Sequence, residues 1–419
     1  MDYQIQNNRG NNYIGRDISQ KLKLADVHNH TLENPNNIHS YPAKMFKSIP
    51  EVIIPYFSKP GDKILDPFCG SGTVLLEAKL RQRNAIGFDI NPLGVLISKV
   101  KTSNVKRDKI KEINAKILKN IEKDNAIDDT FVPNKDFWFS KSAQKQLSAL
   151  AYQVSLIKNI SYREFFLLCL SSSVRYASRA DPEIVPPVIS KRMRPLLKNR
   201  RVNVIKHFSD VVKKNAASLD TIKDIKNNGE IEVKLGDARK LKVKARSINL
   251  VLTSPPYISA QKYPRSLKLE LFWTKLVTTD EFSKIDSETI GTEKVSLLSK
   301  FKEDSSEDPY LKKLLSHIMK KNKERYIITK KYFIDMRKVI KEIYRVLAPN
   351  GYFVLLIGDN TVCNTRIPNG EILTRYAVKE GFNLITTIED QIKTFGFMTR
   401  RNKTAGIIDR EQIIILRKT

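Results

Sequence analysis

The chain of 419 residues carries 74 lysines and arginines against 45 aspartates and glutamates, giving a formal net charge of +29 and an isoelectric point near 9.8. A surplus of this size indicates a polyanionic partner, for which nucleic acid is the obvious candidate. The three cysteines, Cys69, Cys169 and Cys363, lie too far apart in sequence for a disulfide scaffold or a cysteine-based zinc site. There is no apolar run of about 18 residues and no signal peptide, so we expect a soluble, intracellular protein.

Residues 1–37 are expected to form an N-terminal arm. His28, His30 and His39 lie in and just after an asparagine-rich segment without cysteines or regularly spaced acids. This pattern favours surface histidines over metal ligands, and no metal is expected.

The first ligand-binding pattern lies at residues 64–73, where a short apolar strand runs into a glycine-rich turn and then into a helix over 74–82. Gly70 and Gly72 permit positive φ and close approach of a ligand, and the free N–H groups at the helix start favour an anion. A second strand over 84–89 ends in Asp89, at the spacing of about 20 residues where an acid usually binds ribose hydroxyls. The pattern predicts nucleotide-type binding.

A long stretch without a strand pattern follows, from residue 103 to 228. Residues 140–158 and 162–177 carry apolar side chains at i, i+3 and i+4, so we predict an inserted helical domain here. Residues 175–201 combine basic, aromatic and proline residues, which suits contact with DNA. The DNA-binding candidates are Arg175, Arg179, Lys191, Arg192 and Arg194. The alternative is a basic loop that merely crosses the surface.

Two further strands are predicted over 231–235, followed by Gly236 and Asp237, and over 248–252, which runs into Thr253-Ser-Pro-Pro-Tyr257. Two consecutive prolines stiffen this corner and leave nearby carbonyls free to accept hydrogen bonds. The Ser254 hydroxyl and the Tyr257 ring add an acceptor and a stacking face, which together complement the exocyclic amine of a nucleobase. Taken alone, the corner fits an ordinary Pro-Pro turn equally well.

The remainder contains one weakly patterned segment. Residues 287–326 are rich in Ser, Lys and Glu with little apolar periodicity, which predicts a mobile insertion. A helix over 330–347, a strand over 352–357 and a last strand over 413–416 complete an α/β, Rossmann-like, doubly wound sheet. Its predicted binding motifs all follow the carboxyl ends of strands, where open α/β sheets bind ligands.

The glycine-rich turn and the Ser-Pro-Pro-Tyr corner, in this order, resemble S-adenosylmethionine-dependent DNA amino-methyltransferases, which methylate cytosine N4 or adenine N6. The resemblance implies a cofactor-binding part over 38–102 and a catalytic part over 229–419, with 103–228 as candidate target-recognition domain. It implies S-adenosyl-L-methionine as cofactor and double-stranded DNA as partner, with no membrane. A cognate restriction endonuclease and a bacterial cytoplasmic location, at the nucleoid through DNA, are implied by the family only.

The resemblance also implies roles for single residues. The catalytic residues would be Ser254, Pro255, Pro256 and Tyr257. The cofactor-binding residues would be Tyr41, Pro42, Asp66, Phe68, Cys69, Gly70, Ser71, Gly72, Thr73, Asp89 and Asp237. Phe395 and Phe397 are candidates for stacking on the base, with the alternative that they fill the core.

The first residue of the corner bears on the base. Related enzymes that act on adenine commonly carry Asp or Asn there, whereas Ser254 resembles the cytosine-N4 type. Adenine N6 stays open as an alternative with the same mechanics, as do an RNA guanine-N2 enzyme and a catalytically idle DNA-binding subunit. A cytosine-C5 enzyme would need a cysteine nucleophile beside its prolines, which this corner lacks. The target base must leave the duplex to reach such a corner.

Overall fold

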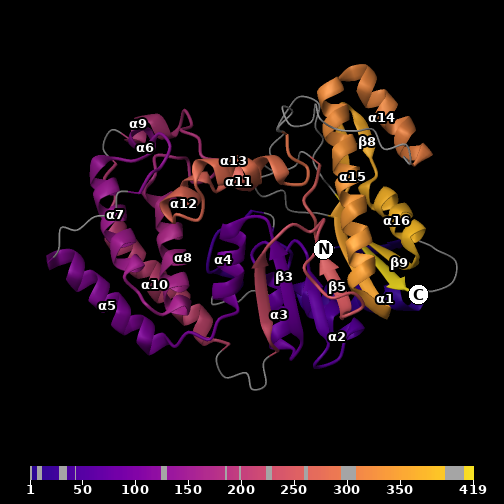
Figure 1. Cartoon of the computed structure of the whole chain (residues 1–419), viewed down its shortest axis with the longest axis horizontal. Coiled ribbons are helices and arrows are strands. Elements are labelled where there is room, and N and C mark those ends of the chain that lie inside the picture. The colour runs from indigo at the N-terminus through magenta and orange to yellow at the C-terminus, as the bar shows by residue number, and fades with distance from the viewer. Residues whose placement is uncertain are drawn as a thin grey trace.

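The computed structural model describes residues 2–6, 12–27, 35–42, 44–123, 130–184, 186–197, 200–222, 229–258, 263–293, 308–391 and 410–419. Within this part, a central sheet of eight strands carries helices on both faces, and a block of helices lies beside it (Figure 1). No helix in these ranges is both long and apolar enough to cross a membrane.

The sheet has the strand order β1-β9-β10-β6-β5-β2-β3-β4. Its strands are β1 (Asp2–Gln6), β2 (Lys63–Asp66), β3 (Asn84–Asp89), β4 (Ile231–Leu235), β5 (Ile248–Thr253), β6 (Leu347–Gly358), β9 (Phe382–Gln391) and β10 (Arg410–Lys418). Strands β2 to β6 run parallel to one another, whereas β10 runs antiparallel to both β6 and β9. The chain builds outward from β2 to β4 and then returns to β5 on the other side of β2, so the order reverses between β2 and β5. Ligands bind at such a switch point in open α/β sheets.

Strand β5 shows why helices cover both faces of the sheet. Leu250 and Leu252 face a cluster with α1 (Asn12–Val27), α2 (Ser48–Phe57) and α3 (Thr73–Leu80). Val251 faces the opposite cluster, built by α14 (Pro309–Lys321), α15 (Lys323–Val346) and α16 (Asn369–Glu380). A nearly continuous apolar run is what a parallel strand buried on both faces requires. The predicted doubly wound sheet is confirmed.

The helices between β3 and β4 form the helical block. Its members are α5 (Arg107–Lys123), α6 (Lys135–Trp138), α7 (Lys141–Ser155), α8 (Ile160–Ala177), α9 (Met193–Leu197) and α10 (Val204–Asp220). Helix α8 packs against α7 and α10, and also against α4 (Pro92–Lys101) and α12 (Lys268–Trp273). The buried Phe139 and Trp273 rings meet edge to face at 5.5 Å across this boundary. The block therefore shares an apolar core with the sheet domain.

The structure differs from the sequence expectation over residues 287–326. Helix α13 (Thr279–Glu288) reaches into this segment, and α14 is an ordered helix capped by Asp308, which accepts from two backbone N–H groups. Leu311, Leu315 and Ile318 are buried at i, i+4 and i+7. With Tyr310 and Leu314, which pack against the same cluster, they form a regular apolar stripe that the sequence prediction overlooked in this lysine-rich segment. The remaining short elements are η1 (Pro35–Asn37), α11 (Tyr263–Ser266), β7 (Asn360–Val362) and β8 (Thr365–Ile367).

Candidate active site

The glycine-rich turn, residues 66–73, links β2 to α3. Gly70 and Gly72 have φ of +46° and +75°, which side chains rarely adopt. A Cβ at Gly72 would lie 2.6 Å from the Ser98 hydroxyl oxygen, so glycine is required there. Ser98 in turn donates to the Gly70 carbonyl at 2.9 Å, which ties the turn to α4. Phe68 and Gly70 keep exposed surface, while the other turn residues are buried.

Asp89 lies at the carboxyl end of β3, beside this turn. Its two oxygens accept from the backbone N–H groups of Gly70 at 2.8 Å and Asn91 at 2.7 Å. Burial raises the pKa of Asp89 to about 6, and the backbone hydrogen bonds oppose the rise. The carboxyl group is therefore largely ionised at neutral pH, and its residue remains partly exposed. It is a fixed acceptor next to the turn.

Tyr41 covers the same turn from the side of the N-terminal segment. A Cβ on Gly70 would lie 3.2 Å from the Tyr41 ring. A Cβ on Gly94 would lie 3.1 Å from both the Tyr41 hydroxyl and the Gly70 carbonyl oxygen, and 3.4 Å from the Asp89 carboxyl carbon. Tyr41, Gly70 and Asp89 thus converge around Gly94, which the motif pattern did not single out. Pro42 follows Tyr41 and is partly buried.

The segment that carries Tyr41, residues 35–42, is called the strap below, and His39 anchors it. His39 is buried; its Nδ1 lies 2.8 Å from the Ser40 carbonyl and its Nε2 lies 3.0 Å from the Ser171 hydroxyl of α8. Burial lowers the pKa of His39 to about 4, so the ring is neutral near pH 7. Nδ1–H donates to the carbonyl and Nε2 accepts from Ser171. The strap is therefore tied to the helical block.

Residues 253–257, the corner, follow β5 on the strand adjacent to β2. The Thr253 hydroxyl donates to the Asp66 carboxylate at 2.6 Å, and the Phe68 N–H donates to the same oxygen at 3.1 Å. Burial raises the pKa of Asp66 to about 7, and these hydrogen bonds oppose the rise. Asp66 therefore joins the corner to the glycine-rich turn across the switch point. Ser254, Pro255 and Pro256 follow directly, with Ser254 partly exposed.

Tyr257 at the end of the corner is held from two sides. Its hydroxyl donates to the Glu411 carboxylate of β10 at 2.9 Å. Burial raises the pKa of Glu411, and the hydrogen bond from Tyr257 opposes the rise. A Cβ on Gly291, whose φ is +79°, would lie 3.0 Å from the Tyr257 carbonyl oxygen. Neither Glu411 nor Gly291 had a sequence signal, because each meets Tyr257 only through the fold.

Asp237 follows β4, next to the end of β3, where the Gly236 N–H donates to the Asp89 carbonyl at 3.0 Å. Arg239 Nε lies 2.9 Å from each Asp237 oxygen, and Arg239 also pairs with Asp335 at 2.9 Å. Burial would raise the pKa of Asp237, but the hydrogen bonds and charge of Arg239 outweigh it, and the pKa is lowered. Asp237 is thus an ionised, oriented side chain at the third strand end, and its contact with the cofactor stays a prediction.

The DNA-binding candidates fall into two groups. The guanidinium groups of Arg175 and Arg179 donate to backbone carbonyls within the helical block. Arg192 pairs with two carboxylates, each 2.7 Å away. Lys191 and Arg194 are exposed, and neither forms an ion pair within the described ranges. The first three form hydrogen bonds or ion pairs within the helical block, and contact of any of the five with DNA stays a prediction.

Some sequence predictions touch residues or groups beyond this site. Phe395 and Phe397 lie outside the described residues. Among the residues that the structure describes, no group of three or more His, Cys, Asp or Glu side chains is arranged to hold a metal ion. Cys69, Cys169 and Cys363 are buried and free, and burial is the main cause that raises the pKa of the Cys69 thiol.

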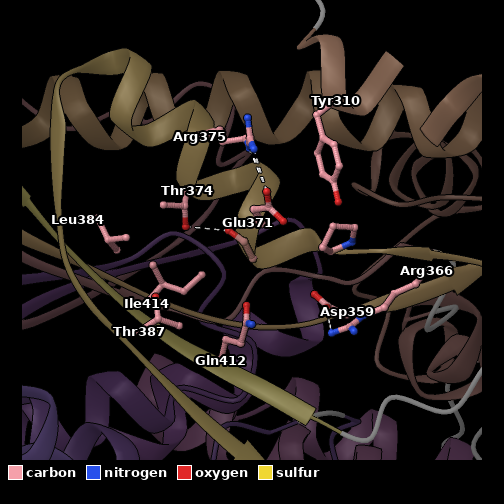
Figure 2. Close-up of a pocket in the computed structure, with 12 residues that line it drawn as sticks. Tyr310, Asp359, Arg366, Glu371, Thr374, Arg375, Leu384, Thr387, Gln412 and Ile414 are labelled. Atoms are coloured by element: carbon pink, nitrogen blue, oxygen red, sulfur yellow. Dashed lines mark hydrogen bonds and ion pairs between the residues drawn. The ribbon is translucent and has the colours of Figure 1, made fainter. Parts of the chain in front are cut away.

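A separate cavity of about 650 Å³ lies between α14, α16 and the β9–β10 pair (Figure 2). Its charged groups are largely internally balanced, because Arg375 pairs with Glu371 and Arg366 pairs with Asp359, each at 2.9 Å. None of its lining residues belongs to the turn or the corner. These lining residues are Tyr310, Asp359, Arg366, Pro368, Gly370, Glu371, Thr374, Arg375, Leu384, Thr387, Gln412 and Ile414.

Comparison with known proteins agrees with this geometry. Residues 1–100 match the family model for DNA methylase of the N6 and N4 type. Over 378 residues, the chain is 25% identical to the type II methyltransferase M.MvaI of Kocuria varians, across 84% of this chain and 82% of that protein. These matches support the DNA amino-methyltransferase family for this chain, which is an S-adenosylmethionine-dependent DNA methyltransferase.

Two further likenesses of this DNA methyltransferase are more limited. The type II methyltransferase M.MjaII of Methanocaldococcus jannaschii is 32% identical over 143 residues, which span 34% of this chain and 25% of that protein. A solved S-adenosylmethionine-dependent methyltransferase of Methanosarcina mazei is 12% identical, with a TM-score of 0.32 over 91% of this chain and 98% of that one.

The residues around the turn of the methyltransferase fit its cofactor. Glycines at 72 and 94 let the turn, α4 and Tyr41 pack closely together, and Gly70 keeps exposed backbone beside Asp89. Asp89 offers ionised acceptor oxygens of the kind that ribose hydroxyls need. The buried turn residues, among them Cys69, Ser71 and Thr73, shape this surface from beneath.

Proposed function

We propose that the enzyme methylates the exocyclic N4 amine of cytosine in duplex DNA. The observation that carries the proposal is the hydrogen bond of 2.6 Å between Thr253 and Asp66. It sets the corner beside the glycine-rich turn, so an amine held at Ser254 and a cofactor held at the turn are neighbours. Ser254 supports cytosine over adenine, because related adenine enzymes commonly carry Asp or Asn there.

Methyl transfer to this amine depends on hydrogen-bond acceptors for its N–H groups more than on a general base. The lone pair of a nucleobase amine is delocalised into the ring, and it becomes nucleophilic when the N–H groups are held out of the ring plane. The Ser254 hydroxyl and the Pro255 carbonyl are the proposed acceptors. They also stabilise the positive charge that develops on nitrogen. When bound, S-adenosylmethionine supplies the electrophilic methyl group.

Tyr257 is the proposed stacking surface for the extruded base. A flipped base is commonly read by stacking between aromatic or apolar side chains. The hydrogen bond to Glu411 fixes the Tyr257 ring at the end of the corner. A fixed ring costs less conformational entropy when the base stacks on it. Phe395 and Phe397 remain proposals for the second face.

The cofactor-binding residues are proposed from the same arrangement. Ionised Asp89 would accept from ribose hydroxyls, and Asp237, held by Arg239, would accept from the adenine amine. Tyr41 and Pro42 of the strap would cover the methionine end. The exposed faces of Phe68 and Gly70 would contact the cofactor, while Asp66 would orient the turn.

Target recognition is proposed for the helical block, residues 103–228. Lys191 and Arg194 beside α9 are its exposed cations among the candidates. The similarity to type II methyltransferases supports a role in a restriction-modification pair, with a cognate endonuclease whose cleavage the modification blocks.

Nucleoside mass spectrometry tests the function. DNA from cells that express the intact chain should gain N4-methylcytosine, and Ser254→Ala should abolish it. Ser155→Ala, an exposed serine at the end of α7, is the matched control and should behave like the intact chain. N6-methyladenine in its place would overturn the base assignment and keep the corner's role. No modified base in DNA would favour an RNA substrate or an idle DNA-binding subunit.

A further inference from the structure

Helix α14 carries lysines and no acid. Lys312, Lys313, Lys320 and Lys321 are all exposed, and its 13 residues contain neither Asp nor Glu. The helical period puts Lys312 and Lys320, eight residues apart, on one row about 12 Å long, with Lys313 beside it. The apolar residues occupy the opposite face. The outcome is a continuous cationic surface on an ordered helix.

Helix α14 differs from α5 in its lack of acids. On α5, Lys109 and Lys111 pair with acids of the same helix, while Lys116, Lys119 and Lys123 are exposed without an ion pair within the described residues. On α14, Lys312, Lys313 and Lys320 make no ion pair within the described part of the chain, and only Lys321 bonds internally, to the Cys363 carbonyl. Like charges this close repel one another unless an anion neutralises them. A merely solvated face, of the kind α5 presents, would intersperse acids.

The packing of α14 relates its charged face to the corner. Its buried Leu311, Leu315 and Ile318 pack into the cluster that contains Ile258, the residue after Tyr257. The ion pair between Arg325 and Glu293, at 2.7 Å, also ties the start of α15 to the segment behind the corner. The cationic helix packs against α15 and β8 and shares an apolar cluster with the residue that follows the corner.

The helical block lies on the other side of the molecule from α14 (Figure 1). Helix α14 projects at the upper right, and α6 and α9 of the helical block project at the upper left, with α11 and α13 between them (Figure 1). Lys191 and Arg194 lie at the α9 end. Cations thus stand on both sides of the edge of the sheet where the corner lies.

We propose that the exposed face of α14 binds backbone phosphates of duplex DNA. DNA is then held between α14 and the helical block while the target base enters the corner. The inference rests on the proposed function and names a partner surface that the motifs do not include. Lysines on phosphates supply affinity and orientation and do not read bases. Helix α14 therefore contributes binding strength without sequence preference.

The test compares two triple variants of the full chain. One carries Lys312→Gln, Lys313→Gln and Lys320→Gln on α14. Its control removes the same charge from exposed positions near the ends of α15 and α16 that lead into β6 and β9, with Lys338→Gln, Lys341→Gln and Lys379→Gln. Duplex binding is measured from low to moderate salt, together with steady-state methylation.

The α14 variant should show a slope of log affinity against log salt that is shallower by about 3, near one unit for each phosphate contact. Its KM for DNA should rise by roughly ten- to a hundredfold at physiological salt. Its kcat at saturating DNA, its affinity for S-adenosylmethionine and its sequence preference should stay unchanged. Arginine at the same three positions should restore the slope.

Distinct results separate the two levels of the claim. If the intact chain methylates DNA and the α14 variant keeps the slope and KM of the control variant, the α14 proposal is overturned and the function stands. Loss of affinity in the arginine variant would overturn phosphate binding in favour of a folding role. No methylation of any duplex by the intact chain would bring down the proposed function and the inference together.

Discussion

Two carboxyl groups, of Asp66 and Glu411, hold the corner at its two ends. Asp66 accepts a hydrogen bond from the Thr253 hydroxyl, and Glu411 accepts one from the Tyr257 hydroxyl. Burial is the largest cause that raises the pKa of each carboxyl group. Each carboxylate therefore gains a hydrogen bond that partly offsets its desolvation, and the corner gains a fixed geometry on both flanks.

The hydrogen bond from Tyr257 to Glu411, which anchors the ring, can be tested by removing the Tyr257 hydroxyl. Tyr257→Phe keeps the stacking ring and removes the hydrogen bond to Glu411, so kcat should fall by roughly five- to tenfold, the equivalent of about 1 kcal/mol. DNA affinity should hold. Tyr257→Ala, which also removes the ring, should lose considerably more. Single-turnover kinetics decide, and a Phe variant as fast as the intact enzyme would show that the anchor is irrelevant.

Glu270 of α12 provides a pH prediction away from the site. It is 4% exposed, and burial raises its pKa from 4.5 to about 7 against the opposing charge of Arg175. Because the folded-state pKa lies above the unfolded one, the folded state binds the extra proton. Its stability is then lost as pH rises from 4.5 to 7, by up to about 1.4 kcal/mol per pH unit.

Glu270→Gln removes this titration. The unfolding free energy of the variant, relative to the intact chain, should rise between pH 5 and pH 8. Urea unfolding at both pH values measures it, with Glu122→Gln, an exposed glutamate of α5, as control. A difference that does not change with pH would contradict the assignment of a raised pKa to Glu270.

At the scale of elements, α8 positions the strap. A side-chain hydrogen bond from Ser171 of α8 to His39 ties the strap to this helix. Ser171→Ala should loosen the strap and so raise the Kd for S-adenosylmethionine by roughly three- to tenfold, the equivalent of about 0.5–1.5 kcal/mol.

Ser173→Ala is the matched control, since Ser173 is equally buried and donates to the Cys169 carbonyl of its own helix at 3.0 Å. Calorimetric titration should leave the Kd of this variant unchanged. Equal effects of the two substitutions would mean that α8 merely loses stability and that the strap is not specifically positioned by Ser171.

Local sequence patterns were enough to predict the turn, the corner and the strands that carry them, because each of these features depends on a few consecutive residues. They could not show that β10 lies antiparallel between β6 and β9, which brings Glu411 to Tyr257 from 154 residues away. The contact between His39 and Ser171 spans 132 residues. Helix α14 has a regular apolar stripe at helical spacing, but it is short and follows a Ser-, Lys- and Glu-rich stretch whose composition dominated the prediction. Partners across the fold have no local signature.

At the scale of the whole molecule, the sheet brings two binding functions to one edge. The reversal of strand order between β2 and β5 sets the turn and the corner side by side. The helical block reaches the cofactor side through the strap, and α14 backs the corner on the other. The chain as a whole has a net charge of +29, which attracts a polyanion. The proposed function places the meeting point of cofactor, base and phosphate backbone at this edge.

The most direct test of the central claim uses purified protein, duplex DNA and S-adenosylmethionine labelled in its methyl group, followed by separation of the DNA nucleosides. The label should appear in N4-methylcytosine with the intact chain and should be lost with Ser254→Ala, while cofactor binding by that variant is retained. Label in 5-methylcytosine, or an equal yield from Ser254→Ala, would contradict the account of the corner.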